Sequence, residues 1–506
     1  MILNDIKAIK TLNELSLQEL ALEYKLEILD LNQTLKIEKY LHVLPFSLIE
    51  QYNIFCFYED DENIHIASLK PLDESILEKI QNLYRLKVVK IFLCDLTQFK
   101  FLLERIKFLI CFQNYLDKLE LNLKSDENKD EFLLEQFLNL ILTYACFLRA
   151  SDIHLEPLEN EVLIRFRIDG ELKYIHSFDV SSYQALLMHV KIIALLNVAE
   201  QRQAQDGSFS KVILEQKYDF RISIMPLLFG QSIVFRILKQ DEYVLKLDRL
   251  FIKEENLTSL KKCMNAPYGL ILFCGPTGSG KSTFMHAILN EFDQNKKIIT
   301  LEDPIEYKLK HAQQILLNSK TGFDFHKALR AVLRQDPDVI MVGEIRDEES
   351  LDIVLKASLS GHLVLSTLHT NGAIEAIFRM KHMGAKEYLI AYALNLIIAQ
   401  RLVRKLCECK EASDEKFHFQ NQVFEGKFYK ANGCAKCMYS GYKGRLMVAE
   451  FLFLDHNLKS MIENNANYEN ILTYALKKGF LTLGRDALEK IKLGLTSVDE
   501  LRKIGF

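Results

Sequence analysis

The sequence predicts an α/β protein of three domains, the last of which holds a nucleotide-binding fold. Three observations lead to this prediction. A chain of 506 residues corresponds to about three domains at roughly 150 residues each. From about residue 247 onward, apolar runs typical of buried strands alternate with helical segments. The chain has no glycine before Gly170, so a glycine-rich loop around a phosphate must belong to the later part.

The composition is that of a globular protein, with 49% hydrophobic and 26% charged residues and a net charge of −4. This near-neutral balance argues against a protein that binds nucleic acid through its overall charge. The most apolar run, 132–148, contains Glu135 and is shorter than the roughly 20 residues that span a membrane, so it predicts a buried helix. The amino terminus has no apolar stretch of signal-peptide length. We therefore expect a cytoplasmic protein without a transmembrane segment.

The first domain is expected over residues 1–122. A helical periodicity between Leu15 and Leu29 precedes apolar runs typical of strands, at 54–58, 64–69 and 88–94. The polar segment 60–63 predicts a turn between the first two of these runs. No pattern that carries chemistry is visible here, and the charged stretch 122–131 is the best candidate for a linker.

The second domain is expected over residues 131–240, as another small α/β unit. Apolar and polar side chains alternate over residues 162–168, and Asp169-Gly170 predicts a tight hairpin turn after them. Four arginines lie on the predicted strands: Arg165, Arg167, Arg221 and Arg236. The pattern alone leaves open whether they form a solvated face or a functional group. Residues 240–246 predict a second linker, which leads into the third domain at 247–506.

Residues 275–282, GPTGSGKS, match the phosphate-binding pattern G-x-x-x-x-G-K-[ST]. An apolar strand precedes the pattern and an amphipathic helix follows it, which is the context that the pattern requires. Glycines let backbone N–H groups converge on phosphates, the lysine reaches the β- and γ-phosphates, and the serine hydroxyl binds Mg²⁺. The predicted ATP-binding residues are Gly275, Pro276, Thr277, Gly278, Ser279, Gly280, Lys281, Ser282 and Thr283, with Ser282 as the magnesium ligand.

Acidic and histidine side chains follow the predicted strands of the same domain. The buried strand 339–342 leads to Glu344, which is placed to orient or activate a water that attacks the γ-phosphate. His362 and His369 bracket the next strand, and we favour γ-phosphate sensing over ordinary core histidines. Strand 298–301 is followed by three acids at the carboxyl edge of the sheet, where ligands of open α/β sheets bind. These acids are Glu302, Asp303 and Glu306.

The sequence contains ten cysteines, of which six stand singly in apolar surroundings, as small core residues of a reduced cytosolic protein do. The other four form two close pairs, Cys407 with Cys409 and Cys434 with Cys437. Four thiolates at this separation predict a structural, tetrahedral Zn²⁺ site. The first pair is spaced C-x-C, so a metal-free subdomain is the alternative.

Taken together, the motifs resemble those of the secretion ATPase superfamily, and within it the type II secretion and type IV pilus assembly ATPases. The resemblance is carried by GPTGSGKST (275–283), TLEDPIEY (300–307), LRQDPDVIMVGEIRD (333–347), GHLVLSTLHTN (361–371) and AQRLVRKLC (399–407). Upstream, SDIHLEP (151–157), RFRIDGEL (165–172) and QDGSFS (205–210) are similar to the family's second amino-terminal domain. The match is strong from about residue 131 onward and weaker over the first 110 residues.

The resemblance implies a RecA-like P-loop NTPase C-terminal domain preceded by two smaller α/β domains, with a small tetracysteine zinc subdomain at about 405–440. It also implies a hexameric ring, with ATP bound at the junction of two domains and neighbouring subunits. Lys281 and Ser282 would belong to the Walker A loop, Glu344 would be the Walker B acid, and His362 and His369 would form the His box. Glu302, Asp303 and Glu306 would form the Asp box.

The arginines also acquire roles from the resemblance. Arg221 and Arg236 would reach the ATP phosphates from the second domain, as a sensor that closes this domain over ATP. Further family arginines are matched by Arg330, Arg334, Arg346 and Arg445. The chain departs from the family pattern at Gln231, where glutamate is usual, and at the C-x-C pair, where C-x-x-C is usual.

The resemblance predicts a Mg²⁺-dependent ATP hydrolase that drives assembly of a type II secretion pseudopilus or of a type IV pilus, including one for DNA uptake in competence. The first 110 residues would dock on the inner-membrane platform or the cytoplasmic anchor protein of that machine, which places the chain peripherally on the inner membrane. A zinc subdomain separates the chain from the pilus-retraction branch. The alternative from another class is a nucleic-acid-translocating hexameric motor, although no direct nucleic-acid binding is expected. The sequence does not decide which machine is served.

Overall fold

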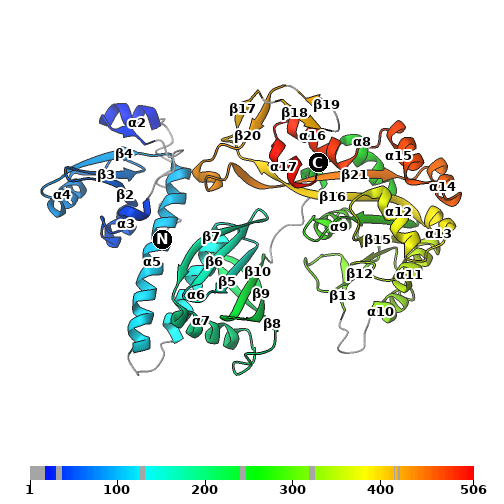
Figure 1. The fold of residues 1–506 in the computed structure, drawn as a ribbon, viewed down its shortest axis with the longest axis horizontal. Coiled ribbons are helices and arrows are strands. Elements are labelled where there is room, and N and C mark those ends of the chain that lie inside the picture. Colours follow the sequence, from blue (N-terminus) through cyan, green and yellow to red (C-terminus); the bar gives the residue numbers. More distant parts are fainter. Residues whose placement is uncertain are drawn as a thin grey trace. The chain divides into compact units, whose positions relative to one another are not determined.

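A computed structural model describes residues 17–29, 37–124, 131–239, 247–317, 325–414, 416–419, 422–424 and 426–505 (Figure 1). The chain divides into two compact units. Unit 1 comprises residues up to Lys239 together with Cys407–Glu411 and Ala431–Lys443, and unit 2 comprises the remainder. The expected linker at 240–246 and the centre of the expected linker at 122–131 lie outside the described residues.

The N-terminal domain of unit 1 is built on a four-stranded sheet of order β1-β4-β3-β2. Its elements are α2 (Leu17–Tyr24), β1 (Glu27–Ile28), η1 (Ile37–Tyr40), α3 (Phe46–Tyr52), β2 (Ile54–Glu59), β3 (Asn63–Ser68), α4 (Glu74–Leu83) and β4 (Val88–Leu93). The three predicted strands are therefore confirmed, with Asp60 Oδ1 closing the turn by accepting the Asn63 N–H at 2.6 Å. The helix expected up to Leu29 instead ends at Tyr24, because Lys25 takes a left-handed backbone conformation (φ 54°).

Helix α5 (Leu96–Lys124) contributes to two hydrophobic cores. Its first half packs into the core of the N-terminal domain through Phe99 and Leu103, among others. Its second half packs into the core of the second domain through Phe108 and Phe112. The boundary expected near residue 122 therefore does not coincide with the change of core, which falls within the helix. An uninterrupted helix of 29 residues hides such a boundary from sequence patterns.

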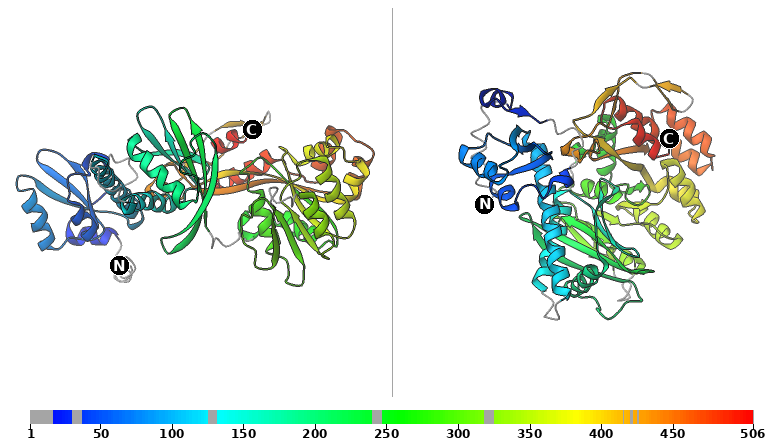
Figure 2. Two further views of the ribbon diagram at one scale, coloured as in Figure 1. Left: turned by 90° about the horizontal axis from the view of Figure 1, so that it is seen from below. Right: turned by 60° about the vertical axis from the view of Figure 1, so that its left-hand side comes forward.

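The second domain is built on a six-stranded antiparallel sheet of order β7-β6-β5-β10-β9-β8. Its elements are α6 (Glu131–Phe147), β5 (Asp152–Pro157), β6 (Val162–Ile168), β7 (Glu171–Phe178), α7 (Val180–Ile193), β8 (Gln205–Ile213), β9 (Gln216–Leu227) and β10 (Gly230–Lys239). Alternate residues of β6 are buried, as predicted. Asp169 (φ 50°) and Gly170 (φ 91°) form the predicted hairpin turn. Helices α5, α6 and α7 share one core with the apolar face of this sheet (Figure 2).

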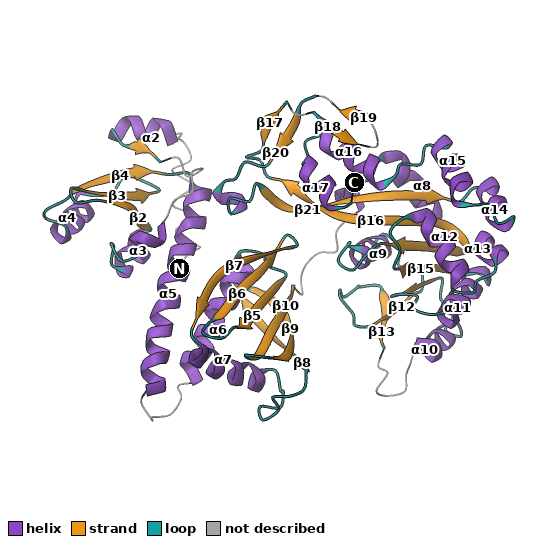
Figure 3. Cartoon of the chain, in the orientation of Figure 1, coloured by secondary structure: helices purple, strands orange, loops and turns teal. Residues whose placement is uncertain are grey.

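Unit 2 contains a seven-stranded sheet of order β13-β12-β14-β15-β11-β16-β21, with helices on both faces (Figure 3). Its strands are β11 (Gly269–Cys274), β12 (Ile298–Glu302), β13 (Ala312–Leu316), β14 (Val339–Val342), β15 (Leu363–Leu368), β16 (Leu394–Leu406) and β21 (Tyr442–Phe453). The pairings that join β13, β12, β14, β15, β11 and β16 are parallel. Carboxyl ends of neighbouring parallel strands meet at one edge, so the loops that follow these strands converge there.

The two faces of this sheet are covered by separate cores. Leu270 and Leu272 of β11 face a core that includes α10 (Phe325–Val332), α11 (Glu348–Leu359), α12 (Ala373–His382), α13 (Glu387–Ala393), α14 (His456–Glu463) and α15 (Tyr468–Lys477). Ile271 and Phe273 face a core with α8 (Glu254–Met264) and α9 (Lys281–Leu289). Burial on both faces explains why β11 is an uninterrupted apolar run in the sequence.

Smaller elements complete the description of the chain. Unit 2 also contains η2 (Leu247–Leu250), α16 (Leu483–Lys492) and α17 (Val498–Lys503). Two further small sheets each have two strands: β17 (Glu411–Ser413), whose first residue belongs to unit 1, pairs with β20 (Phe428–Lys430), and β18 (Phe417–Phe419) pairs with β19 (Gln422–Phe424). The 3-10 turn η4 (Ala435–Cys437) belongs to unit 1. Among the described helices, none has the length and apolar character needed to cross a membrane.

We expect Phe137→Ala to lower the free energy of unfolding of the second domain by about 3–5 kcal/mol, because it removes a fully buried ring. Phe137 lies 5.1 Å from the ring of Phe112 and 5.7 Å from that of Phe178. Denaturant unfolding followed by circular dichroism measures the loss. Phe132→Ala is the matched control, because Phe132 lies on the same helix and is 65% exposed; its effect should stay under about 1 kcal/mol. Equal losses in both variants would contradict the assignment of this core.

Candidate nucleotide and metal sites

The phosphate-binding pattern lies between β11 and α9, as its sequence context predicted. Gly275, Gly278 and Gly280 all have positive φ, at 145°, 78° and 89°. A Cβ atom on Gly275 would stand 2.6 Å from the carbonyl oxygen of Gln400, so no larger residue fits at this position. These glycines let the loop curve into the N-terminus of α9. Backbone N–H groups in such a loop and at a helix N-terminus are suited to binding phosphate.

Lys281 begins helix α9 and is buried. Its Nζ donates hydrogen bonds to the carbonyl oxygens of Gly275 at 2.7 Å and Pro276 at 3.0 Å. Burial lowers the pKa of Lys281, while the nearby Cys274 and Glu344 oppose this shift. The ammonium group is thus held inside the curve of the loop, where a phosphate chain would need a positive charge.

Glu344 follows the carboxyl end of β14, two strands from β11 in the sheet. Its carboxylate accepts a hydrogen bond from Arg346 Nε at 2.6 Å and lies 3.3 Å from His369 Nε2. Thr367 Oγ1 donates to the carbonyl of Gly343 at 2.8 Å, which ties the turn before Glu344 to strand β15. The structure thus brings Glu344, Arg346 and His369 together at the edge of the sheet that carries the phosphate loop.

His362 lies at the opposite edge of the sheet. The N–H of Gly269, at the beginning of β11, donates to the carbonyl of His362, whereas His369 follows the last residue of β15. His362 Nδ1 stands 3.1 Å from the carbonyl of Ala357. The whole length of β15 therefore separates the two histidines within this chain, and sensing of the γ-phosphate by either one stays a prediction.

The three acids at and after the end of β12 differ in burial. Glu302 is buried, where its Oε1 accepts hydrogen bonds from Thr300 Oγ1 at 2.7 Å and Gln314 Nε2 at 2.9 Å, and its Oε2 lies 3.3 Å from His286 Nε2. Burial alone would raise the pKa of Glu302, but these partners outweigh it and lower the pKa. Asp303 and Glu306 are exposed, and Asp303 lies 3.8 Å from Arg346. The expected acidic cluster is thus one buried carboxylate, satisfied by protein groups, and two exposed ones.

Two residues of β16 support the site although sequence analysis gave them no role. Gln400 Nε2 donates to the carbonyl of Ser279 at 2.8 Å and so holds the phosphate loop. Arg401 Nη2 donates to the carbonyl and to the side-chain oxygen of Asn371, both at 3.1 Å, and so holds the loop that follows His369. Both residues stand in the motif AQRLVRKLC. Their roles depend on the pairing of β16 with β11, which local sequence does not reveal.

The remaining arginines of unit 2 make local contacts. Arg330 pairs with Glu349 of α11 at 3.2 Å, and Arg334 Nη1 donates to the carbonyl of Arg330 at 3.0 Å. Arg445 is exposed near the start of β21. None of these contacts includes a residue of the phosphate loop, so the roles implied by the resemblance stay predictions for these three arginines.

In unit 1, charged side chains form a row across the sheet. Arg167, Asp152, Arg236 and Arg221 are neighbours in register on β6, β5, β10 and β9. Arg236 Nε donates to Asp152 Oδ1 at 3.1 Å, while its side chain stays 66% exposed. Arg165 pairs with Glu156 on the same face. This row forms a charged outer face of the sheet, and a contact of Arg221 or Arg236 with ATP stays a prediction.

Gln231 is buried at the start of β10, and its backbone carbonyl accepts a hydrogen bond from the Tyr183 hydroxyl.

The four clustered cysteines come together as predicted. The ligand atoms of Cys407, Cys409, Cys434 and Cys437 all lie within 4.8 Å of one another. Sγ–Sγ distances are 3.9 Å for Cys407–Cys434 and 3.8 Å for both Cys409–Cys437 and Cys434–Cys437. Four thiolates bound at about 2.3 Å to one tetrahedral Zn²⁺ would stand about 3.8 Å apart, so the cluster fits this ion. The C-x-C spacing therefore does not prevent the convergence of the four sulfur atoms.

Comparison with known proteins assigns the chain to a family. A family described as "Type II/IV secretion system protein" matches residues 127–503, and an "MshEN domain" matches residues 24–107. The chain belongs to the type II/IV secretion system protein family. The type II secretion system ATPase E of Vibrio cholerae is 39% identical over 386 residues, covering 75% of this chain and 76% of the relative. The type IV pilus assembly ATPase PilB of Acinetobacter baylyi is 34% identical over 480 residues, covering 90% and 83%.

Solved structures agree with this assignment. The pilus retraction motor PilT, determined with bound ADP, is 27% identical, has a TM-score of 0.52, and covers 73% of this chain and 96% of its own length. The ATPase DotB of Legionella pneumophila shares the fold, with a TM-score of 0.56 at 21% identity over 73% of this chain and 95% of its own. The predicted identification as an ATP-hydrolysing secretion ATPase is confirmed, and these relatives give the nucleic-acid alternative no support.

We expect Lys281→Ala and Glu344→Gln each to abolish ATP turnover, with losses of about 100-fold or more in kcat. The first removes the charge inside the phosphate loop, and the second removes the carboxylate that Arg346 and His369 hold. Phosphate release by the purified protein measures both. Lys356→Ala is the control, because Lys356 is an exposed lysine on α11 paired with Asp352. Wild-type turnover in either variant would contradict the assignment of the site.

We expect Glu302→Gln to make the free energy of unfolding depend less on pH in the acidic range. A carboxyl whose pKa falls on folding stabilises the protein above its unfolded pKa of about 4.5, and this contribution is lost as the pH falls through the folded value. The variant should be less stable than wild type at neutral pH and should lose less stability between about pH 6 and about pH 3. Thermal unfolding across this range tests the sign. Glu306→Gln, a change to an exposed acid nearby, should follow the wild-type curve.

Proposed function

We propose that this ATPase works in the cytoplasm as a homo-hexamer and powers assembly of a type II secretion pseudopilus or a type IV pilus. The observation that carries the proposal is the arrangement at the carboxyl edge of the seven-stranded sheet. There the phosphate loop, Glu344 and His369 follow three consecutive neighbours in the sheet, β11, β14 and β15. The similarity to named secretion and pilus assembly ATPases supports the choice of machine.

In the proposed reaction, the backbone N–H groups of the phosphate loop and Lys281 bind the β- and γ-phosphates of ATP. Ser282 would hold Mg²⁺, which supplies neutralising charge to the phosphates. Glu344 would orient the attacking water and accept its proton, with its carboxylate held by Arg346 and His369. His369, and not His362, is the histidine that we assign to the γ-phosphate.

Arg221 and Arg236 are proposed to contact the ATP phosphates from the second domain. Arg221 of β9 and Arg236 of β10 are register partners, and Arg236 keeps a largely exposed side chain although it pairs with Asp152. Such a pair offers two adjacent positive charges to a polyphosphate. For Arg330, Arg334 and Arg445 we propose a role in the ATPase on the basis of the family resemblance alone.

The N-terminal domain is proposed to dock on the inner-membrane platform or the cytoplasmic anchor protein of the machine, which would hold the motor peripherally at the membrane. Support comes from the separate core of this domain, which gives it a folded surface of its own. Docking through a folded domain also suits a protein in which no described helix has the length and apolar character to cross a bilayer.

A clean deletion, scored together for secretion, piliation and DNA uptake, tests the machine served. Loss of one process with retention of the others identifies the machine, and complementation with the Lys281→Ala variant should fail. Normal secretion, piliation and DNA uptake in the deletion strain would reject the proposal. ATPase activity of the purified protein that rises with DNA, but not with partner domains or membranes, would instead favour a nucleic-acid motor.

The cysteine cluster is proposed to hold one structural Zn²⁺ through Cys407, Cys409, Cys434 and Cys437. We expect elemental analysis of protein prepared without chelator and with reduced thiols to find about one zinc per chain. Cys437→Ser should remove it, because a tetrahedral structural site needs all four thiolates. Cys263→Ser is the control, since Cys263 stands outside the cluster. Wild-type protein without zinc under these conditions would exclude the metal.

A further inference from the structure

The cysteine knuckle, which we define as Cys407–Glu411 with Ala431–Lys443, groups with unit 1 and not with the ATPase sheet. This was not expected, since the sequence places the knuckle inside the third domain. Cys407 directly follows Leu406, the last residue of β16, and β16 is a strand of the unit 2 sheet. The knuckle is therefore continuous in sequence with the ATPase sheet while it packs with the N-terminal half of the chain.

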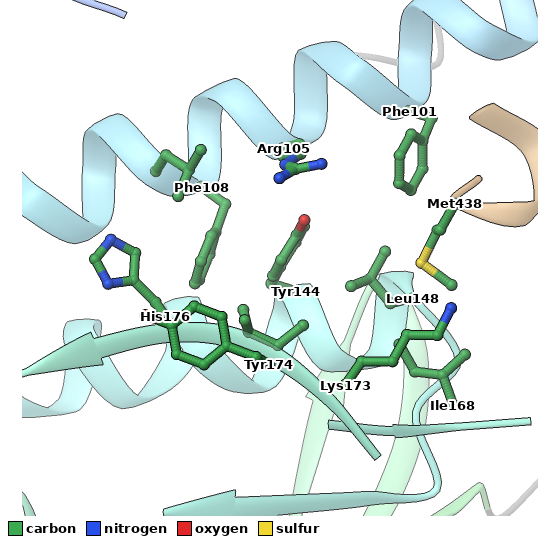
Figure 4. A pocket seen from close by; sticks show the side chains of 12 residues that line it. Phe101, Arg105, Phe108, Tyr144, Leu148, Ile168, Lys173, Tyr174, His176 and Met438 are labelled. Atoms are coloured by element: carbon green, nitrogen blue, oxygen red, sulfur yellow. The ribbon is translucent and has the colours of Figure 1, made fainter. Parts of the chain in front are cut away.

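The packing of the knuckle is directed at helix α5. Turn η4 lies against this helix. Met438, next in the chain, packs on the core of the second domain, and Tyr439 packs on the core of the N-terminal domain. Figure 4 shows Met438 beside Phe101, Leu148, Ile168 and Lys173, where it forms one wall of a cavity of about 360 Å³. Two consecutive side chains thus contact the two cores that α5 connects.

The backbone that presents these two side chains is strained. Met438 (φ 53°) and Tyr439 (φ 59°) both take the left-handed conformation, which non-glycine residues adopt only when their surroundings enforce it. The enforcing contacts come from the cysteines. Tyr439 N–H donates to the carbonyl of Cys434 at 2.9 Å, and Gly441 N–H donates to Cys437 Sγ at 3.2 Å. The geometry of the thiol cluster therefore determines where Met438 and Tyr439 point.

We propose that the cysteine knuckle is a metal-dependent docking surface for helix α5. With the cation bound, the knuckle presents Met438 to the second domain and Tyr439 to the N-terminal domain, and it fastens both domains to the end of strand β16. The inference rests on the proposed zinc loading of the four thiolates. The ion itself does no more than hold the turn, and the contact with α5 is made by side chains of the protein.

Docking at this place connects α5 to the phosphate loop through one strand. Gln400, which holds Ser279 of the loop, and Leu406, which precedes the first cysteine, belong to the same strand β16. A load applied to the N-terminal domain would therefore reach the strand that supports the loop, and a shift of the loop would reach α5.

Amide hydrogen exchange of residues 99–112 in the full-length protein tests the proposal. We expect Met438→Ala with Tyr439→Ala to keep wild-type zinc content and to speed exchange in this part of α5 by about tenfold or more, because the docking contacts are removed. Met438→Leu with Tyr439→Phe should restore protection, since both changes keep most of the apolar volume. Asn432→Ala is the matched control on the knuckle, at an exposed side chain paired with Glu411.

Removal of zinc from the wild-type protein by chelation should produce the same faster exchange in α5, and return of zinc should reverse it. Exchange that is unchanged in the Met438→Ala, Tyr439→Ala protein overturns the docking surface, whatever the zinc content. Faster exchange in that protein but none on chelation overturns the dependence on metal. If the wild-type protein contains no zinc, the proposed zinc site itself is wrong. Elemental analysis distinguishes this result from a failure of docking.

Discussion

The parallel pairing of β11 with β15 on one side and β16 on the other is the constraint on which the ATPase site depends. It brings the phosphate loop, the residues around His369 and the end of β16 to one edge of the sheet. Gly275 has no space for a side chain because Gln400 of β16 stands against it, and the same glutamine holds Ser279. The shape of the loop therefore depends on two neighbouring strands, β11 and β16, that are far apart in the sequence. Glu344 joins this arrangement through β14, the next strand, and is held there by Arg346 and His369.

Strand β16 also connects the cysteine cluster to the ATPase sheet. It ends one residue before Cys407, and the knuckle that follows packs with α5 and with the two cores that this helix connects. A small domain with few apolar residues gains stability from a bound metal, because the four ligands replace a core that the segment is too short to form. In this chain the turn at Met438 and Tyr439 is tied to two of the cysteines, through the carbonyl of Cys434, which accepts the Tyr439 N–H, and through Cys437 Sγ, which accepts the Gly441 N–H.

Much of the fold could be predicted because its signals are local. The apolar run of β11, the glycine pattern after it, the alternation along β6 and the Asp169-Gly170 turn each lie within a few residues, and all four are present in the structure. Features that depend on distant pairing could not be predicted in this way. The sequence predicts Glu302 as a site acid but does not reveal that its carboxylate is buried against Thr300, Gln314 and His286. His362 and His369 looked like a pair, although a strand between them carries each to a different edge.

The sequence by itself determined the chemistry of this protein: a phosphate loop with its lysine and serine, an acid after a buried strand, four thiolates in two close pairs, and a family resemblance that the comparisons confirm. These features are local, because each needs particular residue types at a short spacing. Only the tertiary structure decided that Glu344 and His369 lie together, that Gln400 holds the phosphate loop and Arg401 the loop after His369, and that the cysteine knuckle packs with the N-terminal half of the chain. These outcomes depend on strand order and on which core each side chain enters, and both arise from contacts between residues far apart in the sequence.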